Sequence, residues 1–461
     1  MAQYVPTELG TRSIPRLLFQ YAVPAIIAMT AASLYNIVDS IFIGHIGPDG
    51  QWGNSDGMAI SGLALTFPLM NIGAALGAMV GVGASTVISV RLGQRDYKTA
   101  QHVLGNTVVL NLLLGTLFMV ACLLFLDPIL TLFGASEATR PYARDYMTVI
   151  LLGNVISHSY FGLNAVLRAA GHPEKAMYCT ILTVVVNAIL DPLFIFILGM
   201  GIKGAATATI LSQLISLCWQ FKLLCNPTEM LHLHRGIYGL SLRIIRQIIA
   251  VGMSPFLMNL CACLVVLLIN KGMKQYGGDT AIAAYGIVNR VVFLFLMMVM
   301  GLNQGMQPIV GYNWGARQNS RVWQTLCLTI ACAEVVVITG FVMGVFFPDI
   351  LTHLFTDNAA IVSMADRGFR IDVSVFPIVG AQMVIGNFFQ SIGHAGKSIF
   401  QSLTRQLLFL IPGLILLPPH FGLDGVWLAI PVSDTLSFFV SMGMLWWLVN
   451  KVKGEELRGK E

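Results

Sequence analysis

Residues 171–175 (GHPEK) have a counterpart at residues 393–397 (GHAGK), 222 positions further along the chain. The same separation aligns residues 91–93 (RLG) with residues 313–315 (NWG). Self-similarity at one fixed separation is the sequence signature of an internal repeat. The chain is therefore predicted to consist of two related halves.

The chain is too apolar for a water-soluble protein. Of its 461 residues, 56% are hydrophobic and 11% are charged, whereas a soluble domain carries about 25% charged residues. Apolar stretches of about 20 residues recur, and each is long enough to cross a bilayer as a helix. We expect an all-α integral membrane protein with twelve spans, near residues 15–44, 59–90, 101–126, 141–170, 175–198, 203–224, 242–272, 280–313, 322–347, 365–392, 396–418 and 424–450.

Six spans in each half keep both halves in the same orientation across the membrane, as in transporters whose halves move about a central cavity. We expect two pseudo-symmetric six-helix lobes, at residues 1–224 and 242–450, with a cytoplasmic linker at 225–241 and a cytoplasmic tail at 451–461. Most of the 27 lysines and arginines, Arg405 among them, fall on the side of both termini. The positive-inside rule then predicts a multi-pass protein of the inner (plasma) membrane with both termini in the cytoplasm.

Four acidic residues fall within the predicted spans, and an ionisable group there is a functional candidate because its burial is costly. They are Asp39, Asp191, Glu334 and Asp434. Asn187 and Asp191 are four residues apart and share one helix face, while Pro192 leaves a backbone carbonyl without its helical donor. Such oxygens suit a small cation, although a carboxylate in this setting could carry a proton instead.

Comparison of the two halves separates architecture from function. Pro24, which removes a helical hydrogen bond and favours a kink, recurs as Pro255 at a separation of 231. Asp39 aligns with Asn270, and the position of Asp191 has no acid in the second half. The acids of the first half are therefore the stronger candidates for function.

Other polar or flexible residues give weaker signals. Asp434 aligns with Gln213, which favours a packing hydrogen bond, and Arg290 is a conceivable partner for Glu334. Thr207 and Thr209 open the sixth span, where threonine often bonds only its own backbone. Candidates for a substrate cavity are Tyr35, Met258, Met297 and Met300, since methionine suits varied apolar ligands, although it is also an ordinary core filler.

Several function classes lack their motifs. The sequence contains no zinc-ligand spacing, nucleophilic triad, Walker A loop or dinucleotide loop in a suitable setting. We therefore expect neither an enzyme nor an organic cofactor, and we expect an ion gradient rather than ATP as the energy source. A channel, and an exporter or flippase of an amphipathic or lipid-linked metabolite, remain as alternatives.

The chain resembles the multidrug and toxic compound extrusion (MATE) transporters over nearly its full length, closest to the DinF-like or MepA-like branch. The segments that carry this resemblance are 24–44 (ending DSIFIG), 190–195 (LDPLFI), 199–206 (GMGIKGAA), 307–316 (QPIVGYNWGA) and 390–393 (QSIG). The resemblance implies a monomeric antiporter that exports cationic or amphipathic compounds in exchange for H⁺ or Na⁺. It implies lipid and small-molecule partners but no nucleic acid.

The resemblance also implies site residues. The coupling site would comprise Asp39, Asn187, Asp191 and Thr209, with Asn164 adjoining and Pro24 as the bending point. These four residues would ligate a metal only if the coupling ion is Na⁺. Residues 247–270 contain no acid, unlike the seventh helix of the NorM-like branch, and Asp372 lies early in the tenth span. A cation site in the second lobe is therefore not expected.

Overall fold

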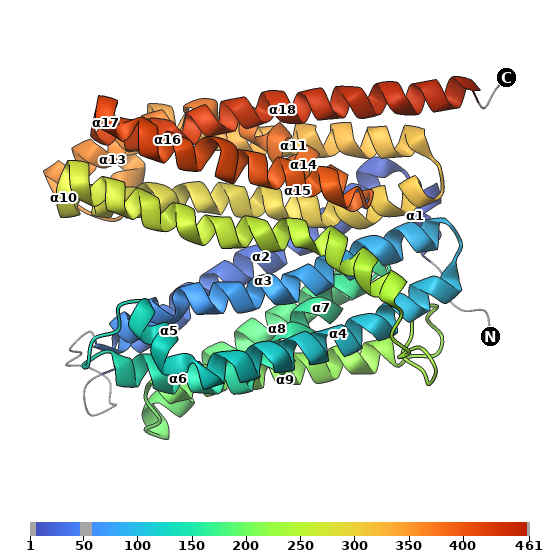
Figure 1. The fold of residues 1–461 in the computed structure, drawn as a ribbon, viewed down its shortest axis with the longest axis horizontal. Coiled ribbons are helices and arrows are strands. Elements are labelled where there is room, and N and C mark those ends of the chain that lie inside the picture. The colour runs from blue at the N-terminus through green and yellow to red at the C-terminus, as the bar shows by residue number, and fades with distance from the viewer. Residues whose placement is uncertain (1–5, 47–57, 459–461) are drawn as a thin grey trace.

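The computed structural model describes residues 6–46 and 58–458, which fold into helices. Figure 1 shows two bundles, the first blue to green and the second yellow to red. The first contains α1 (Glu8–Thr11), α2 (Ile14–Gly44), α3 (Met58–Gly93), α4 (Tyr97–Leu124), α5 (Leu126–Leu132), α6 (Arg140–Leu152), α7 (Asn154–Ala169), α8 (Pro173–Pro192), the π-helix η1 (Leu193–Ile197) and α9 (Ile202–Leu224). The second contains α10 (Leu242–Gly315), α11 (Asn319–Phe346), α12 (Pro348–His353), α13 (Ala359–Asp372), the 3-10 helix η2 (Val373–Val375), α14 (Phe376–Ser391), α15 (Ala395–Leu403), the π-helix η3 (Thr404–Leu410), α16 (Ile411–Leu416), α17 (Pro418–Phe421) and α18 (Leu423–Arg458). We call these the N-bundle and the C-bundle.

The helices account for twelve membrane spans. Nine helices of the described residues are long and apolar enough to cross a membrane, and the pair α6 and α7, bent by 55°, makes a tenth. Helix α10 counts twice, because Gly278 has φ 68° and ψ −162° and the chain doubles back there. Helix α9 has 23 residues, enough to cross a bilayer core of about 30 Å, and its buried residues Gln213 and Ser216 form hydrogen bonds with side chains on α7 and α8. The predicted all-α fold of twelve spans in two bundles is confirmed.

The internal repeat extends to unusual backbone conformations. Arg95 has φ 60° and Arg317 has φ 57°, 222 positions apart, and a positive φ is uncommon outside glycine. Gly201 (φ 55°, ψ −136°) and Gly422 (φ 58°, ψ −134°) form a second pair, both directly before the last long helix of their bundle. Both halves therefore build the same turns at matching positions.

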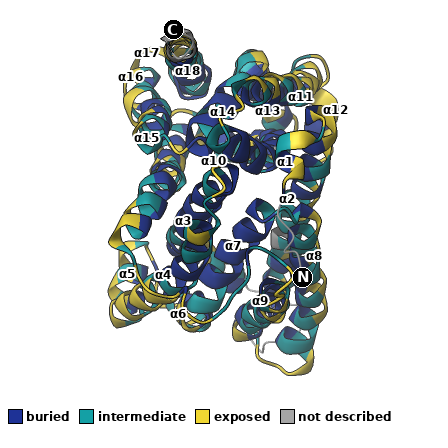
Figure 2. Ribbon diagram, turned by 90° about the vertical axis from the view of Figure 1, so that its right-hand side faces the viewer, coloured by how far each residue is buried: buried dark blue, intermediate teal, exposed yellow. Residues whose placement is uncertain are grey.

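Both chain ends lie at one end of the molecule, which we call the terminal face (Figure 1). The two bundles meet toward this face and diverge toward the opposite end. Seen from the terminal face, buried residues concentrate on α3, α10 and α14 in the middle of the molecule, and exposed ones on outer helices such as α4 and α12 (Figure 2). Large exposed side chains on the outer helices, such as Leu117 and Trp446, suit contact with lipid.

Glycines allow the bundles to approach closely between α3 and α10. A Cβ atom added to Gly83 would lie 2.1 Å from the carbonyl oxygen of Ile248. A Cβ atom added to Gly252 would lie 1.8 Å from the carbonyl oxygen of Met79. Small residues of this kind bring helix backbones together in membranes, so these two glycines join the bundles in the halves of the helices nearer the terminal face.

The predicted bending point, Pro24, lies beside a second contact between the bundles. A Cβ atom added to Gly301 would lie 2.7 Å from Cα of Ile26, and one added to Gly305 would lie 2.6 Å from Cα of Ala22. Pro24 is buried within the continuous helix α2. Helix α10 therefore holds α2 on both sides of Pro24, while bending at this residue stays a prediction.

We expect Gly252→Ala to lower the stability of the protein by about 1–3 kcal/mol, because the added methyl group forces packed backbones apart. The change should appear as a lower melting temperature of the purified protein in detergent. Gly286→Ala is the matched control in the second span of α10, since no described atom lies within 4 Å of its added Cβ. Equal melting temperatures for the two variants would show that the close approach at Gly252 does not join the bundles.

Candidate functional site

Three helices bring five polar side chains together inside the N-bundle. Asp39 and Tyr35 lie one turn apart on α2, Asn187 and Asp191 lie one turn apart on α8, and Thr209 lies on α9. We call these residues the N-bundle polar cluster. Asp39, Asn187, Asp191 and Thr209 are all buried.

Hydrogen bonds link the cluster across the helices. The Tyr35 hydroxyl lies 3.2 Å from Thr209 Oγ1. Asn187 Nδ2 donates to Asp191 Oδ1 at 3.2 Å and to Thr209 Oγ1 at 3.4 Å. Asp39 lies within electrostatic range of Asp191 and Tyr35. The structure thus brings together the four residues of the predicted coupling site, along with Tyr35.

Three buried oxygens of the cluster have no hydrogen-bond partner among the described residues. They are Asp39 Oδ1, Asn187 Oδ1 and Asp191 Oδ2. A buried polar atom without a partner is costly, so such atoms call for an explanation. A small cation ligated by these oxygens would satisfy them, and so would protonation of the carboxyl groups, which makes each a donor.

The donor set limits which ion fits. Groups of three or more His, Cys, Asp or Glu side chains suited to a metal do not occur in the part of the chain that the structure describes. The cluster offers carboxylate, amide and hydroxyl oxygens, which are hard ligands, and no sulfur or imidazole. This chemistry fits a proton or a hard cation such as Na⁺ and not a soft transition metal.

Tyr146 is a cluster neighbour that the sequence analysis missed. It lies on α6, is fully buried, and is within electrostatic range of Asp39, Tyr35 and Asp191. Nothing in its local sequence marks it, because its approach depends on how α6 packs in the bundle. Its phenol group is a further buried polar group beside the cluster.

Asn164 lies apart from the other predicted site residues. Its Nδ2 donates to the Ala176 carbonyl at 2.9 Å and to Thr180 Oγ1 at 3.4 Å, and Arg168 donates to its side-chain oxygen. These partners on α8 lie two to three turns before Asn187. No hydrogen bond among the described residues joins Asn164 to the cluster.

The predicted cavity methionines all lie on α10. Met258, Met297 and Met300 are half-buried, and no described hydrogen bond or ring contact links them to the cluster. Their contact with substrate stays a prediction.

The suggested pair between Glu334 and Arg290 does not form. Glu334 Oε1 accepts a hydrogen bond from the backbone N–H of Ala381 at 2.7 Å, which joins α11 to α14. Arg290 is exposed and has no ion pair with a described residue. The suggestion was wrong because a backbone donor of the adjacent helix lies closer to the carboxylate.

A second buried charged group lies in the C-bundle. Arg405 Nε donates to Asp434 Oδ1 at 2.6 Å, and Asp372 is buried within electrostatic range of both. The sequence analysis placed Arg405 at the terminal face, but it lies in η3, well inside the span Ala395–Phe421. Asp434 therefore makes the expected hydrogen bond between helices, and the charge of its partner Arg405 makes this contact an ion pair as well.

The sequence profile of the MatE family matches residues 24–193 and 252–415, which is more than half of the chain. The chain belongs to the MatE family. This MatE-family member is accordingly a multi-pass membrane transporter and not an enzyme, and transport in the family is coupled to an ion. The resemblance seen in the sequence is confirmed.

Individual relatives agree with this assignment over nearly their full length. The multidrug export protein MepA of Staphylococcus haemolyticus is 26% identical over 440 residues, which is 95% of each chain. MepA of Staphylococcus aureus is 26% identical over 440 residues, which is 95% of this chain and 94% of that protein.

Solved structures of MATE transporters share the fold. The multidrug transporter DinF-BH, solved in complex with a drug-like small molecule, has a TM-score of 0.86 and 35% identity, covering 95% of this chain and 96% of that one. A MATE transporter of the MOP superfamily in an outward-facing conformation has a TM-score of 0.90 at 24% identity, covering 98% of this chain and 100% of that one. At 24% identity, this second structure shows only that the fold is shared.

We expect Thr209→Val to weaken ion-coupled transport about 5- to 30-fold, because it removes the hydroxyl group that hydrogen-bonds both Tyr35 and Asn187, at a cost of about 1–2 kcal/mol. Thr209→Ser, which keeps the hydroxyl, should restore most of the activity. Thr207→Val is the matched control, since among the described residues that hydroxyl bonds the Lys203 carbonyl on its own helix alone. Dye efflux from vesicles measures all three. Similar losses in the two valine variants would argue against a special role for Thr209.

Proposed function

We propose that this protein exports cationic or amphipathic drugs and toxic compounds in exchange for H⁺ or Na⁺, with the N-bundle polar cluster as the coupling site. The proposal rests on three buried oxygens, on Asp39, Asn187 and Asp191, that have no hydrogen-bond partner among the described residues. The MepA relatives are multidrug export proteins, which supports the substrate class. The small molecule bound to the multidrug transporter DinF-BH supports it further.

The geometry suggests how ion binding drives transport. Asp39 and Tyr35 belong to α2, whereas Asn187, Asp191 and Thr209 belong to α8 and α9. An ion bound between these residues draws α2 toward α8 and α9, since it neutralises the repulsion between the two carboxylates. A proton on either carboxyl group has the same effect on this repulsion.

Movement of α2 then changes the space available to the drug. The part of α2 around Pro24 is held against Gly301 and Gly305 of α10, so α2 bends near Pro24 and the segment beyond this residue moves. We propose that this bending closes the drug site, which includes Tyr35, Met258, Met297 and Met300, and releases the drug outward.

The proposal includes the placement of the protein in the membrane. The terminal face lies in the cytoplasm, as the distribution of lysine and arginine favours, and the protein is a monomer of the inner (plasma) membrane. The lobes span residues 1–224 and 242–450, joined by the linker 225–241 and followed by the tail 451–461.

Efflux of ethidium, a cationic fluorescent dye, from proteoliposomes under separate Na⁺ and H⁺ gradients tests the proposal. We expect ethidium to leave the vesicles against its gradient when one of the two ions flows inward. Downhill movement of dye without ion exchange would indicate a channel. Movement of lipid without movement of dye would indicate a flippase.

A further inference from the structure

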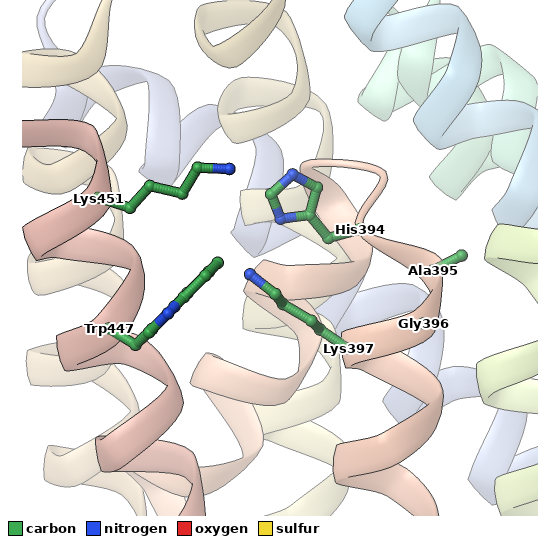
Figure 3. Close-up of a pocket in the computed structure, with 6 residues that line it drawn as sticks. All are labelled: His394, Ala395, Gly396, Lys397, Trp447 and Lys451. Carbon is green, nitrogen blue, oxygen red and sulfur yellow. The ribbon is translucent and has the colours of Figure 1, made fainter. Parts of the chain in front are cut away.

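The C-bundle carries a pocket of about 410 Å³ at the terminal face, between the start of α15 and the end of α18 (Figure 3). Figure 3 shows the side chains of Lys397, Lys451 and His394 pointing toward one another across this pocket, with Trp447 beside them. The remaining lining residues are Ala395 and Gly396. The pocket has no part in the mechanism proposed above.

Two positive charges share one aromatic ring in this pocket. Lys397 Nζ lies 3.4 Å from the centre of the Trp447 ring, and Lys451 Nζ lies 5.6 Å from the same ring. An indole face attracts a cation, but two ammonium groups this close repel each other. None of the described residues forms an ion pair with Lys397.

A histidine lines the pocket beside the two lysines. The His394 ring packs edge-on against Trp314, with ring centres 5.7 Å apart, and its buried Nδ1 has no described hydrogen-bond partner. Burial of the ring, together with the charges of Lys397 and Lys451, lowers the pKa of His394. The positive charge of the pocket therefore comes from the lysines.

The first half of the chain provides an internal control. His172 and Lys175, the repeat counterparts of His394 and Lys397, both face Glu229. His172 Nε2 lies 2.9 Å from Glu229 Oε2, and Lys175 Nζ lies 3.4 Å from Glu229 Oε1. This turn in the N-bundle thus holds a carboxylate between its histidine and its lysine.

The two halves differ in the charged residue that the last helix of each bundle, or the segment after it, places beside this turn. Glu229 follows α9, the last helix of the N-bundle, and Lys451 lies toward the end of α18, the last helix of the C-bundle. The C-bundle therefore keeps the histidine and lysine that hold an anion, and it has a lysine where the N-bundle supplies the anion. Among the described residues, a positive side chain thus lies where the N-bundle has a negative one.

We propose that this pocket binds the phosphate group of an anionic phospholipid at the membrane surface. Two ammonium groups and an imidazole match the several acceptor oxygens of a phosphate, and basic pockets between spanning helices on the cytoplasmic side bind lipid headgroups. Trp446, next to the lining residue Trp447, has 70% of its surface exposed, as expected of an interfacial anchor. The lipid source is favoured over free phosphate because the pocket lies at the ends of two lipid-facing spans.

Thermal unfolding of the full-length protein in detergent micelles tests this inference. Added phosphatidylglycerol should raise the melting temperature by about 2–4 °C, whereas phosphatidylcholine and inorganic phosphate should not. Native mass spectrometry should show a retained phosphatidylglycerol. Equal shifts with both lipids would overturn the proposal, and a shift with inorganic phosphate alone would assign the pocket to a soluble anion instead.

A double variant, Lys397→Gln with Lys451→Gln, tests whether phosphatidylglycerol raises the melting temperature by binding at this pocket. It should abolish the phosphatidylglycerol shift, whereas Lys175→Gln, the counterpart in the N-bundle, should retain it. A full shift in the double variant would place the lipid elsewhere and contradict the proposal. The comparison of lipids in the wild-type protein needs no variant, so it stands even if a substitution impairs folding.

Discussion

Replacing Asp39 or Asp191 by asparagine is expected to reduce ion-driven efflux of ethidium about 10- to 100-fold. Each substitution removes one of the two charges at the N-bundle polar cluster, and an interaction with a charged group is worth about 1.5–3 kcal/mol. Asparagine keeps the size of the side chain, so the fold should be preserved. Efflux from proteoliposomes measures the loss, and the melting temperature checks the fold.

Glu334→Gln is the matched control for these two variants. Glu334 also lies within a span and has a buried oxygen without a hydrogen-bond partner among the described residues, but it belongs to the C-bundle and its other oxygen accepts from the Ala381 N–H. Glutamine can still accept this hydrogen bond, so efflux should stay near the wild-type rate. Wild-type efflux in both aspartate variants would remove the basis for the proposed coupling site.

Arg405→Gln is expected to lower the free energy of unfolding by about 3–5 kcal/mol. The substitution removes the partner of Asp434, whose side chain is 5% exposed, and an uncompensated buried charge is strongly destabilising. Asp372 adds to the effect, because it faces the same group of charges. Denaturant or thermal unfolding in detergent measures the change.

The double variant Arg405→Gln with Asp434→Asn tests whether the lost stability comes from the unpaired charge of Asp434 or from the loss of the Arg405 side chain itself. Removal of both charges leaves no unpaired ion between the two positions, so most of the lost stability should return. If the double variant is less stable than Arg405→Gln alone, Arg405 is not the group that compensates the buried charge of Asp434.

The sequence predicted the features that follow from spacing and repetition. Apolar stretches gave the twelve spans, and the break predicted between residues 272 and 280 is the reversal at Gly278. Asn187 and Asp191 were predicted to share a face because they are four residues apart. Asp39 was singled out because its counterpart is Asn270, and the structure places it beside them.

Features that depend on packing between distant segments were missed. Tyr146 reaches the cluster from α6, a helix that shares no motif with α2 or α8. Arg405 and Asp434 are separated by 29 residues, and a hydropathy pattern does not show which helices will be neighbours. Glu334 accepts a hydrogen bond from a backbone N–H group. Side-chain composition does not reveal a backbone partner of this kind.

The central claim is that the coupling ion acts at Asp39 and Asp191. The most direct measurement is the affinity of the purified protein for ethidium, by fluorescence anisotropy, with and without Na⁺ and over a range of pH. The coupling ion is expected to weaken dye binding in the wild-type protein, whereas a variant carrying both Asp39→Asn and Asp191→Asn should bind dye independently of that ion. The same ion dependence in the double variant as in the wild-type protein would contradict the central claim.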